Sequence, residues 1–278
     1  MEDELVVQDA APALRRHIRR YRGYAQRTDG PASQREPVST GAILIFGLGP
    51  DLKVLDPADP TRPPELLGSF VGGLDDSCAI VGHDGEMRGV QVDLTPLAAR
   101  IIFRVPMHEL ARRVVPLEDI LGLEATRLEE QLLEAPSWEE RFLLVETALA
   151  ARLEAAAAPP PDVDWAWRRL TSANGRIRIA DLAAELGCSR KHLAVKFREH
   201  VGLPPKLVAR MLRFRHTVDV LLASPESSIA EIAASCGYYD QAHLDRDFRE
   251  FARTTPTEYA ADPRASVTFV QDADAIAA

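Results

Sequence analysis

Short apolar runs, separated by glycine, proline and aspartate, dominate residues 38 to 105. They read AILIF, LKVL, SFVGG, CAIVG, GVQVDL and RIIF. In GVQVDL the apolar side chains of Val90, Val92 and Leu94 recur with a period of two, which is typical of strands with one buried face. The first half of the chain is therefore predicted to form a small β-sandwich or barrel.

After Leu117 the apolar period changes to three or four residues, which predicts helices up to Ala157. Ser137 and Glu140 have the spacing of a capping box at the start of one such helix. Its apolar stripe either packs on the β-rich half, the outcome we favour, or contacts a second chain in a homodimer. The stripe consists of Trp138, Phe142, Val145, Leu149 and Leu153.

The stretch AAAAPPPD, from Ala155 to Asp162, contains three consecutive prolines. Proline cannot donate a backbone hydrogen bond, and it disfavours helix in the residue before it. We therefore predict one domain over residues 1–158, a second over 159–262, and a tail over 263–278 in which the run SVTFV forms an additional strand.

Two segments of the C-terminal third repeat one another. The first is IADLAAELGCSRKHLAVKFREHVGLPP, from Ile179 to Pro205, and the second is IAEIAASCGYYDQAHLDRDFREFARTTP, from Ile229 to Pro256. Ten identities align once a single residue is inserted. Each segment has a short helix with small alanines, a glycine able to adopt positive φ, and a second amphipathic helix, which together predict a helix-turn-helix. The fold class is thus α+β, with a β-rich first domain and an all-α second domain.

The segment between the repeats, Lys206 to Leu222, has apolar positions that fit one helix of 17 residues. Such a helix is roughly 25 Å long and could separate two recognition helices by about one turn of a DNA duplex. The two units would then face successive major grooves.

Charge is distributed unevenly along the chain. The net charge is −9, yet residues 165–215 carry 12 Lys or Arg against 3 Asp or Glu. This local excess of positive charge indicates contact with a polyanion, here double-stranded DNA, although a solvated basic face remains the alternative.

Outward side chains of each second helix are the predicted readers of DNA bases. In the first unit Lys191 is expected to donate to guanine, and Ala194 and Val195 to touch thymine methyl groups. In the second, Gln241 is expected to pair with adenine, Asp245 with cytosine and Arg246 with guanine. Phosphate contacts are expected from Arg176, Arg190, Lys196 and Lys206. The predicted DNA-binding set is Arg176, Ser189, Arg190, Lys191, Ala194, Val195, Lys196, Lys206, Gln241, Ala242, Asp245 and Arg246.

Three acidic residues surround the second recognition helix: Asp240, Asp245 and Asp247. They are expected to repel phosphates, so the first unit should supply most of the affinity, while the second adds selectivity or contacts a protein. Replacing Lys191 and Lys196 by alanine should then weaken binding more than Arg246→Ala.

The repeated units, ending in GYYDQAHLDRDFREFARTTPTEY, resemble the paired helix-turn-helix domain of AraC/XylS-type transcription regulators over about residues 162–262. Phe248 and Pro256 fit the signature of this family. Leu244 stands where an aromatic residue is frequent, and Arg253 where glycine is frequent. The segment FRVPMHELARRVVPLEDILG resembles the sensor half of a subgroup. The resemblance implies a cupin-like N-terminal domain that senses an unknown small molecule or dimerises, and recruitment of RNA polymerase.

The residues give no indication of an enzyme or a cofactor. The histidines of the first half, His17, His83 and His108, are too scattered for the metal site of a cupin enzyme. His83 is expected in a solvated turn, with a role in a ligand pocket as the alternative. A protein-interaction or ligand-binding module that has lost DNA binding remains the alternative function.

Three cysteines are too few for a disulfide framework or a four-cysteine zinc site. Cys78 is expected in the core; its context, CAIVGHDGE, does not suit a reactive thiol, which argues against a repair methyltransferase. Cys188 and Cys236 are expected to pack beside the helix turns, with a redox switch as the alternative. The acidic start and the lack of a long apolar stretch predict a cytoplasmic protein without a membrane span.

Overall fold

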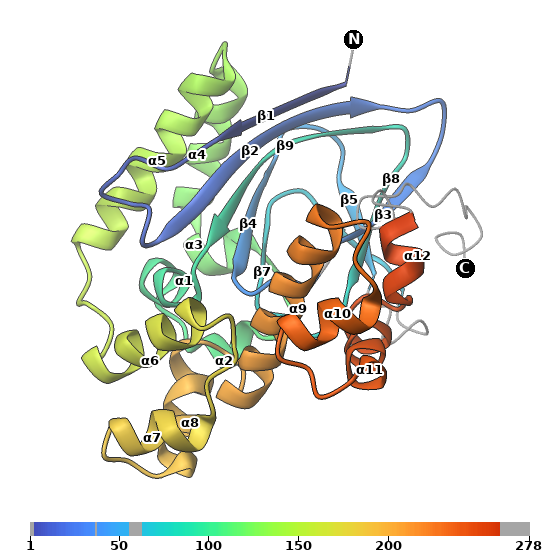
Figure 1. The fold of residues 1–278 in the computed structure, drawn as a ribbon. Coiled ribbons are helices and arrows are strands. Elements are labelled where there is room, and N and C mark those ends of the chain that lie inside the picture. Colours follow the sequence, from blue (N-terminus) through green and yellow to red (C-terminus); the bar gives the residue numbers. More distant parts are fainter. Residues whose placement is uncertain (1–2, 37, 56–62, 262–278) are drawn as a thin grey trace.

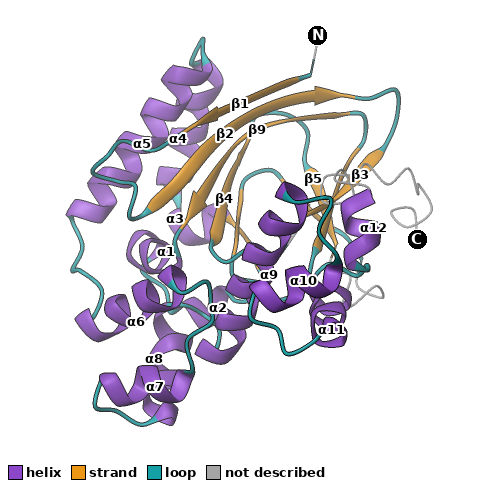
Figure 2. Ribbon diagram, viewed as in Figure 1, coloured by secondary structure: helices purple, strands orange, loops and turns teal. Residues whose placement is uncertain are grey.

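The computed structural model describes residues 3–36, 38–55 and 63–261. Antiparallel strands form the N-terminal part and helices form the C-terminal part, which confirms the α+β fold class (Figures 1 and 2). In the described part of the chain, no helix has the length and apolar character needed to cross a bilayer.

Two antiparallel sheets build the N-terminal half, as the alternating runs predicted. One has six strands in the order β1 (Glu4–Gln8), β2 (Ile18–Arg27), β9 (Glu86–Leu94), β4 (Ala42–Gly47), β7 (Phe70–Gly72) and β10 (Val114–Pro116). The other has four, in the order β3 (Ala32–Glu36), β8 (Ala79–His83), β5 (Leu52–Leu55) and β6 (Glu65–Leu67). The predicted alternation in β9 holds, because Val90, Val92 and Leu94 are all buried.

The apolar run RIIF is helical, and its assignment to the strand-forming segments was wrong. It ends α1 (Pro96–Phe103), whose first turn is capped by Thr95, the side chain of which accepts a hydrogen bond from the Ala98 amide. A capping threonine followed by proline at the first helical position starts a helix, and this local signal outweighs the apolar content of the run.

Helices α3 (Leu117–Leu121), α4 (Leu123–Glu134) and α5 (Trp138–Glu154) follow, as predicted, after the short α2 (Met107–Leu110). The stripe of α5 packs on the six-stranded sheet: the Phe142 ring lies 5.9 Å from that of Tyr21. A Cβ atom at Gly23 would come within 2.3 Å of the Trp138 ring, so only glycine permits this approach. The intramolecular alternative for this stripe is therefore confirmed.

Both predicted helix-turn-helix units are present. The first consists of α7 (Ile179–Glu185) and α8 (Arg190–His200), and the second of α10 (Ile229–Ser235) and α11 (Gln241–Phe251). The connecting helix α9 (Pro205–Ala223) is one residue longer at each end than predicted. Helices α6 (Pro161–Ser172) and α12 (Pro256–Ala261) flank the pair. Gly187 and Gly237 have the predicted positive φ, 62° and 80°.

The two halves of the chain are packed against each other. Val38, Leu74 and Leu97 from the N-terminal half belong to the same buried apolar cluster as the cores of the helix-turn-helix units. Helix α2 packs on α8, and a Cβ atom at Gly202, after α8, would lie 3.0 Å from the Met107 carbonyl oxygen. The predicted boundary falls between α5 and α6, in the segment after Glu154.

Several single-residue expectations can be compared with the structure. His83 is 2% exposed at the end of β8, so its expected place in a solvated turn was wrong, and burial lowers its pKa. Cys78 and Cys236 are buried and Cys188 is half-buried, all as free thiols. The expected strand SVTFV lies outside the described residues.

Candidate nucleic-acid interface

Helix α8 presents the outward face that the repeat predicted. Its start is capped by Ser189, whose Oγ accepts a hydrogen bond from the His192 amide at 3.1 Å. Phe197 points into the core, together with Leu193. Lys191 is exposed, and 55% of Val195 is exposed, an unusual position for a branched apolar side chain. Ala194 is half-buried beside them.

Helix α11 is built in the same way. Asp240 caps it, with Oδ1 accepting from the His243 amide at 2.7 Å. Its outward residues Gln241, Ala242 and Arg246 are exposed, and Asp245 is half-buried. The Arg246 guanidinium donates to the Ala242 carbonyl at 3.3 Å, which directs this side chain along the helix surface.

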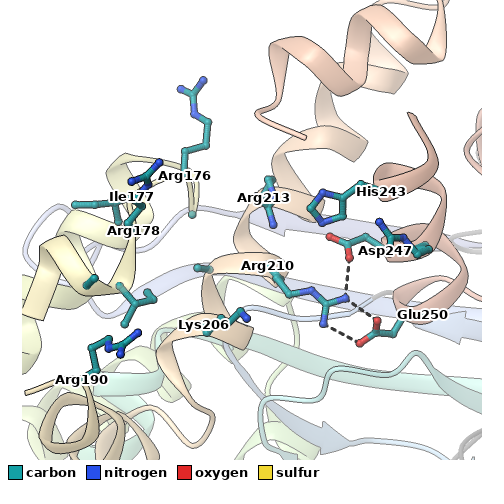
Figure 3. A pocket seen from close by; sticks show the side chains of 15 residues that line it. Arg176, Ile177, Arg178, Arg190, Lys206, Arg210, Arg213, His243, Asp247 and Glu250 are labelled. Atoms are coloured by element: carbon teal, nitrogen blue, oxygen red, sulfur yellow. Dashed lines mark hydrogen bonds and ion pairs between the residues drawn. The ribbon is translucent and has the colours of Figure 1, made fainter. Parts of the chain in front are cut away.

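A cleft of about 740 Å³ lies between the two units (Figure 3). The segment that joins α6 to α7 forms one side, α11 forms the other side, and α9 runs between them. Its lining is rich in cationic side chains: Arg176, Arg178, Arg190, Lys206, Arg210, Arg213 and Arg246.

The acidic residues of the cleft are neutralised within it. The Arg210 guanidinium donates to Asp247 at 2.7 Å and to Glu250 at 2.6 and 3.0 Å. The pKa of Arg210 is raised, mainly by its hydrogen bonds to Glu250 and also by its hydrogen bond to Asp247. Over residues 3–36, 38–55 and 63–261, no carboxylate lies within ion-pair distance of the six other cations. The cleft therefore carries a large uncompensated positive charge, which attracts anions.

Four of the residues predicted for DNA contacts line this one cleft: Arg176, Arg190, Lys206 and Arg246. Arg176 lies between the units, since its guanidinium donates to the Ser235 carbonyl of the second unit at 3.5 Å. The tertiary structure thus brings together residues up to 70 positions apart in the sequence.

Lys196 does not line this cleft, and its phosphate contact stays a prediction. Its ammonium is hydrogen-bonded to Asp162 at the start of α6, and this bond lowers the pKa of Asp162. The side chain is directed to the neighbouring helix, where it forms an ion pair at a partly exposed position.

The expected repulsion around α11 is also reduced. Asp247 is 1% exposed and is paired with Arg210, so it does not face solvent. Asp240 and Asp245 remain on the outer side of the helix. Two of the three carboxylates expected to repel phosphates therefore remain exposed to solvent at least in part, and the weaker affinity of the second unit stays a prediction.

Arg178, Arg213 and Tyr239 were not among the predicted DNA contacts. Arg178 and Arg213 line the cleft, and the Arg213 guanidinium lies over the Tyr238 ring, 4.8 Å from its centroid. Tyr239 is 93% exposed directly before the cap of α11. The spacing of Lys206, Arg210 and Arg213 at i, i+4 and i+7 was a visible signal for a charged face on α9.

These elements define a paired helix-turn-helix domain with a basic cleft between its units. Residues 182–262 match the family described as "Helix-turn-helix domain". Residues 182–262 thus form a helix-turn-helix domain, which agrees with the resemblance to AraC/XylS-type regulators found in the repeat.

The chain is also similar to individual proteins. It is 30% identical over 83 residues to the Msm operon regulatory protein of Streptococcus mutans serotype c, and this match spans about 30% of each protein. The crystal structure of ToxT from Vibrio cholerae O395 is 12% identical, with a TM-score of 0.47 over 87% of this chain and 97% of that one. An AraC-type transcriptional regulator from Chromobacterium violaceum is 23% identical, with a TM-score of 0.34 over 38% of this chain and 93% of that one.

Proposed function

We propose that the chain is a DNA-binding transcription regulator whose two helix-turn-helix units enter adjacent major grooves of one duplex. The observation that carries the proposal is the cleft between the units, with six cations that have no acidic partner in the described part of the chain. Such a concentration of guanidinium and ammonium groups suits the phosphate backbone. Two amphipathic helices with exposed outer faces lie on either side of it.

In this proposal α8 reads bases through Lys191, Ala194 and Val195, and α11 reads them through Gln241 and Arg246. A lysine or arginine donates to guanine, a glutamine pairs with adenine, and small apolar groups contact thymine methyls. Arg246 also lines the cleft, so it can reach either a base or the backbone. Arg176, Arg190 and Lys206 contact phosphates and thereby set the register on the duplex.

The N-terminal domain is proposed to sense a small molecule or to form a homodimer, and the regulator is proposed to recruit RNA polymerase. A cluster of charged side chains, formed by Arg22, Glu36 and Asp93 on strands of both sheets, supports the sensing role. Asp93 accepts hydrogen bonds from Arg22 and Gln91, each at 2.7 Å. Glu36 is half-buried nearby, and desolvation raises its pKa. Mass spectrometry of the natively purified protein would detect a co-purified effector.

Footprinting on the promoter region beside the gene tests DNA binding. We expect two protected segments on one face of the duplex, with centres about one helical turn apart. Lys191→Ala and Arg246→Ala should each weaken protection, whereas Arg168→Ala, at an exposed position on α6 paired with Asp164, should not. Absence of protection at low salt would exclude the regulator and favour an interaction module without DNA binding.

A further inference from the structure

The connecting helix α9 has a basic face of its own. Lys206, Arg210 and Arg213 are spaced at i, i+4 and i+7 and all line the cleft. Positions with this spacing lie on one side of a helix. The three side chains span about 10 Å at 1.5 Å per residue, a length of duplex axis that presents roughly six phosphates.

This face cannot turn away from the cleft, because the opposite side of α9 is part of the core. Val208, Met211 and Phe214 are each at most 1% exposed. The Phe214 ring contacts those of Phe248 and Phe251, with centroids 4.9 and 5.3 Å away. Packing of this kind fixes the rotation of a helix about its axis.

The cleft lies where the backbone of a bound duplex would pass. Two major-groove contacts on one face of DNA are separated by a minor groove, which is bordered by the two phosphate backbones. A protein that holds both grooves with α8 and α11 brings this backbone to the element between them. In the structure that element is α9, with Arg178 beside it on the wall formed by the segment between α6 and α7 (Figure 3).

One cation of the three is not available to an external anion. Both terminal nitrogens of Arg210 donate to carboxylates, and Asp247 is buried below it. Glu250 is different, because 48% of its side chain is exposed at the edge of the cleft. Loss of the Glu250 charge would leave one side of the guanidinium free while Asp247 still holds the other.

We propose that α9 is a third DNA-contacting element. Lys206 and Arg213, with Arg178 on the neighbouring wall of the cleft, bind backbone phosphates between the two grooves, and Glu250 limits the affinity by holding Arg210. The inference rests on the proposed function and adds contacts that do not depend on base sequence. The group that these side chains bind is the phosphodiester of the DNA backbone.

The test measures the dependence of affinity on salt, with fluorescently labelled duplexes and the full chain. One duplex carries the footprinted segment and the other has an unrelated sequence. Each phosphate contact adds about 0.9 to the slope of log K against log salt. Lys206→Ala and Arg178→Ala should therefore each reduce the slope by about 1 on both duplexes. Arg168→Ala, outside the cleft, is the matched control.

Glu250→Gln is expected to change the salt slope in the opposite direction. It should steepen the slope by up to about 1 and tighten binding to both duplexes, because Arg210 gains access to a phosphate. Glu226→Gln removes the same charge from an exposed position between α9 and α10, and it should leave the slope unchanged. Thermal unfolding of each variant controls for damage to the fold.

Two results would overturn this inference and leave the proposed reading of adjacent grooves by α8 and α11 intact. One is an unchanged slope in Lys206→Ala and Arg178→Ala, with specific affinity still lost in Lys191→Ala. The other is stabilisation by inorganic phosphate at constant ionic strength that disappears in Lys206→Ala while the slope for DNA is unchanged, which would assign the cleft to a free anion. Failure of the wild-type chain to bind either duplex would instead contradict the proposed function.

Discussion

At the scale of single residues, Arg253 shows that the turn after the second helix of each unit needs a residue with positive φ. It has a φ of 55°, in the left-handed region, and the corresponding residue of the first unit, Gly202, has a φ of 103°. Both follow the second helix of their unit, so the turn requires a positive φ whichever residue occupies it. A residue with a Cβ atom is strained there.

Arg253→Gly should therefore raise the free energy of unfolding by about 0.5–1 kcal/mol, since relief of strain exceeds the added entropy of glycine in the unfolded chain. Chemical denaturation measures this difference. Arg249→Gly, at an exposed position inside α11, serves as the control and should be destabilising by about 1 kcal/mol. Equal destabilisation by both substitutions would contradict the strain.

Lys196 affects the stability of the fold at acid pH through its ion pair with Asp162. Because the hydrogen bond from Lys196 lowers the pKa of Asp162 in the folded state, its contribution to stability is present above the ordinary value of 3.8. It is lost as the pH falls through the lower, folded-state pKa. Lys196→Gln should flatten the acid side of the stability profile below about pH 4, while DNA affinity stays within about twofold, since the ammonium is paired with Asp162 and lies outside the cleft.

Unfolding at a series of pH values and one binding isotherm check this prediction. Arg190→Gln, on the same helix and in the cleft, is the comparison: it should leave the acid profile unchanged and weaken DNA binding. A loss of affinity in Lys196→Gln as large as in Arg190→Gln would restore the role that the sequence suggested for Lys196.

At the scale of elements, α8 and α11 differ in the residue that caps them. Ser189 and Asp240 accept the same hydrogen bond, from the amide three residues later. Serine and aspartate are nearly equivalent as caps, but aspartate places a negative charge at the end of the helix that is proposed to enter the groove. The two helix starts therefore have the same capping geometry but differ by one negative charge.

Asp240→Ser should therefore change the free energy of unfolding by less than about 0.5 kcal/mol. It should tighten DNA binding by roughly threefold at low salt, because repulsion of about 0.5–1 kcal/mol is removed. Ser189→Asp in the first unit is the reciprocal variant and should weaken binding. Fluorescence anisotropy measures both, and equal affinities of the two variants would mean that neither cap lies near phosphate.

At the scale of the whole molecule, the N-terminal half contributes to the core of the DNA-binding half. Leu97, in α1, is 4% exposed within the cluster of the helix-turn-helix units, and α2 packs on α8. A shared core couples the stability of two domains. It also gives the N-terminal domain a direct contact with the helix proposed to read DNA.

Leu97→Ala should cost about 2–4 kcal/mol by leaving a cavity, and the loss should appear in both halves. Hydrogen exchange, read peptide by peptide, tests this: amides of α8 should lose protection together with those of α1. Leu128→Ala, in the cluster of the N-terminal half alone, is the control and should leave α8 unaffected. Loss of protection confined to α1 would mean that the halves unfold independently.

The sequence alone determined the local elements of this protein. The apolar runs between residues 38 and 105 indicated strands of both sheets but not β1, β2, β3, β6 or β10, and the repeat located two helix-turn-helix units, the connecting helix and their glycine turns. These features depend on side chains a few residues apart, whose relative positions follow from the helix or strand itself. RIIF was misassigned because its composition was considered without the cap that precedes it.

Only the tertiary structure decided which charges are free. Lys196 meets Asp162, 34 residues away, and Arg210 meets Asp247, 37 residues away, so neither pairing follows from a local pattern. The same packing buried His83 and assembled the basic cleft from four separate segments. An ion pair depends on where two elements lie relative to each other, and that is set by the fit of their apolar faces over the whole core rather than by the spacing of residues along the chain.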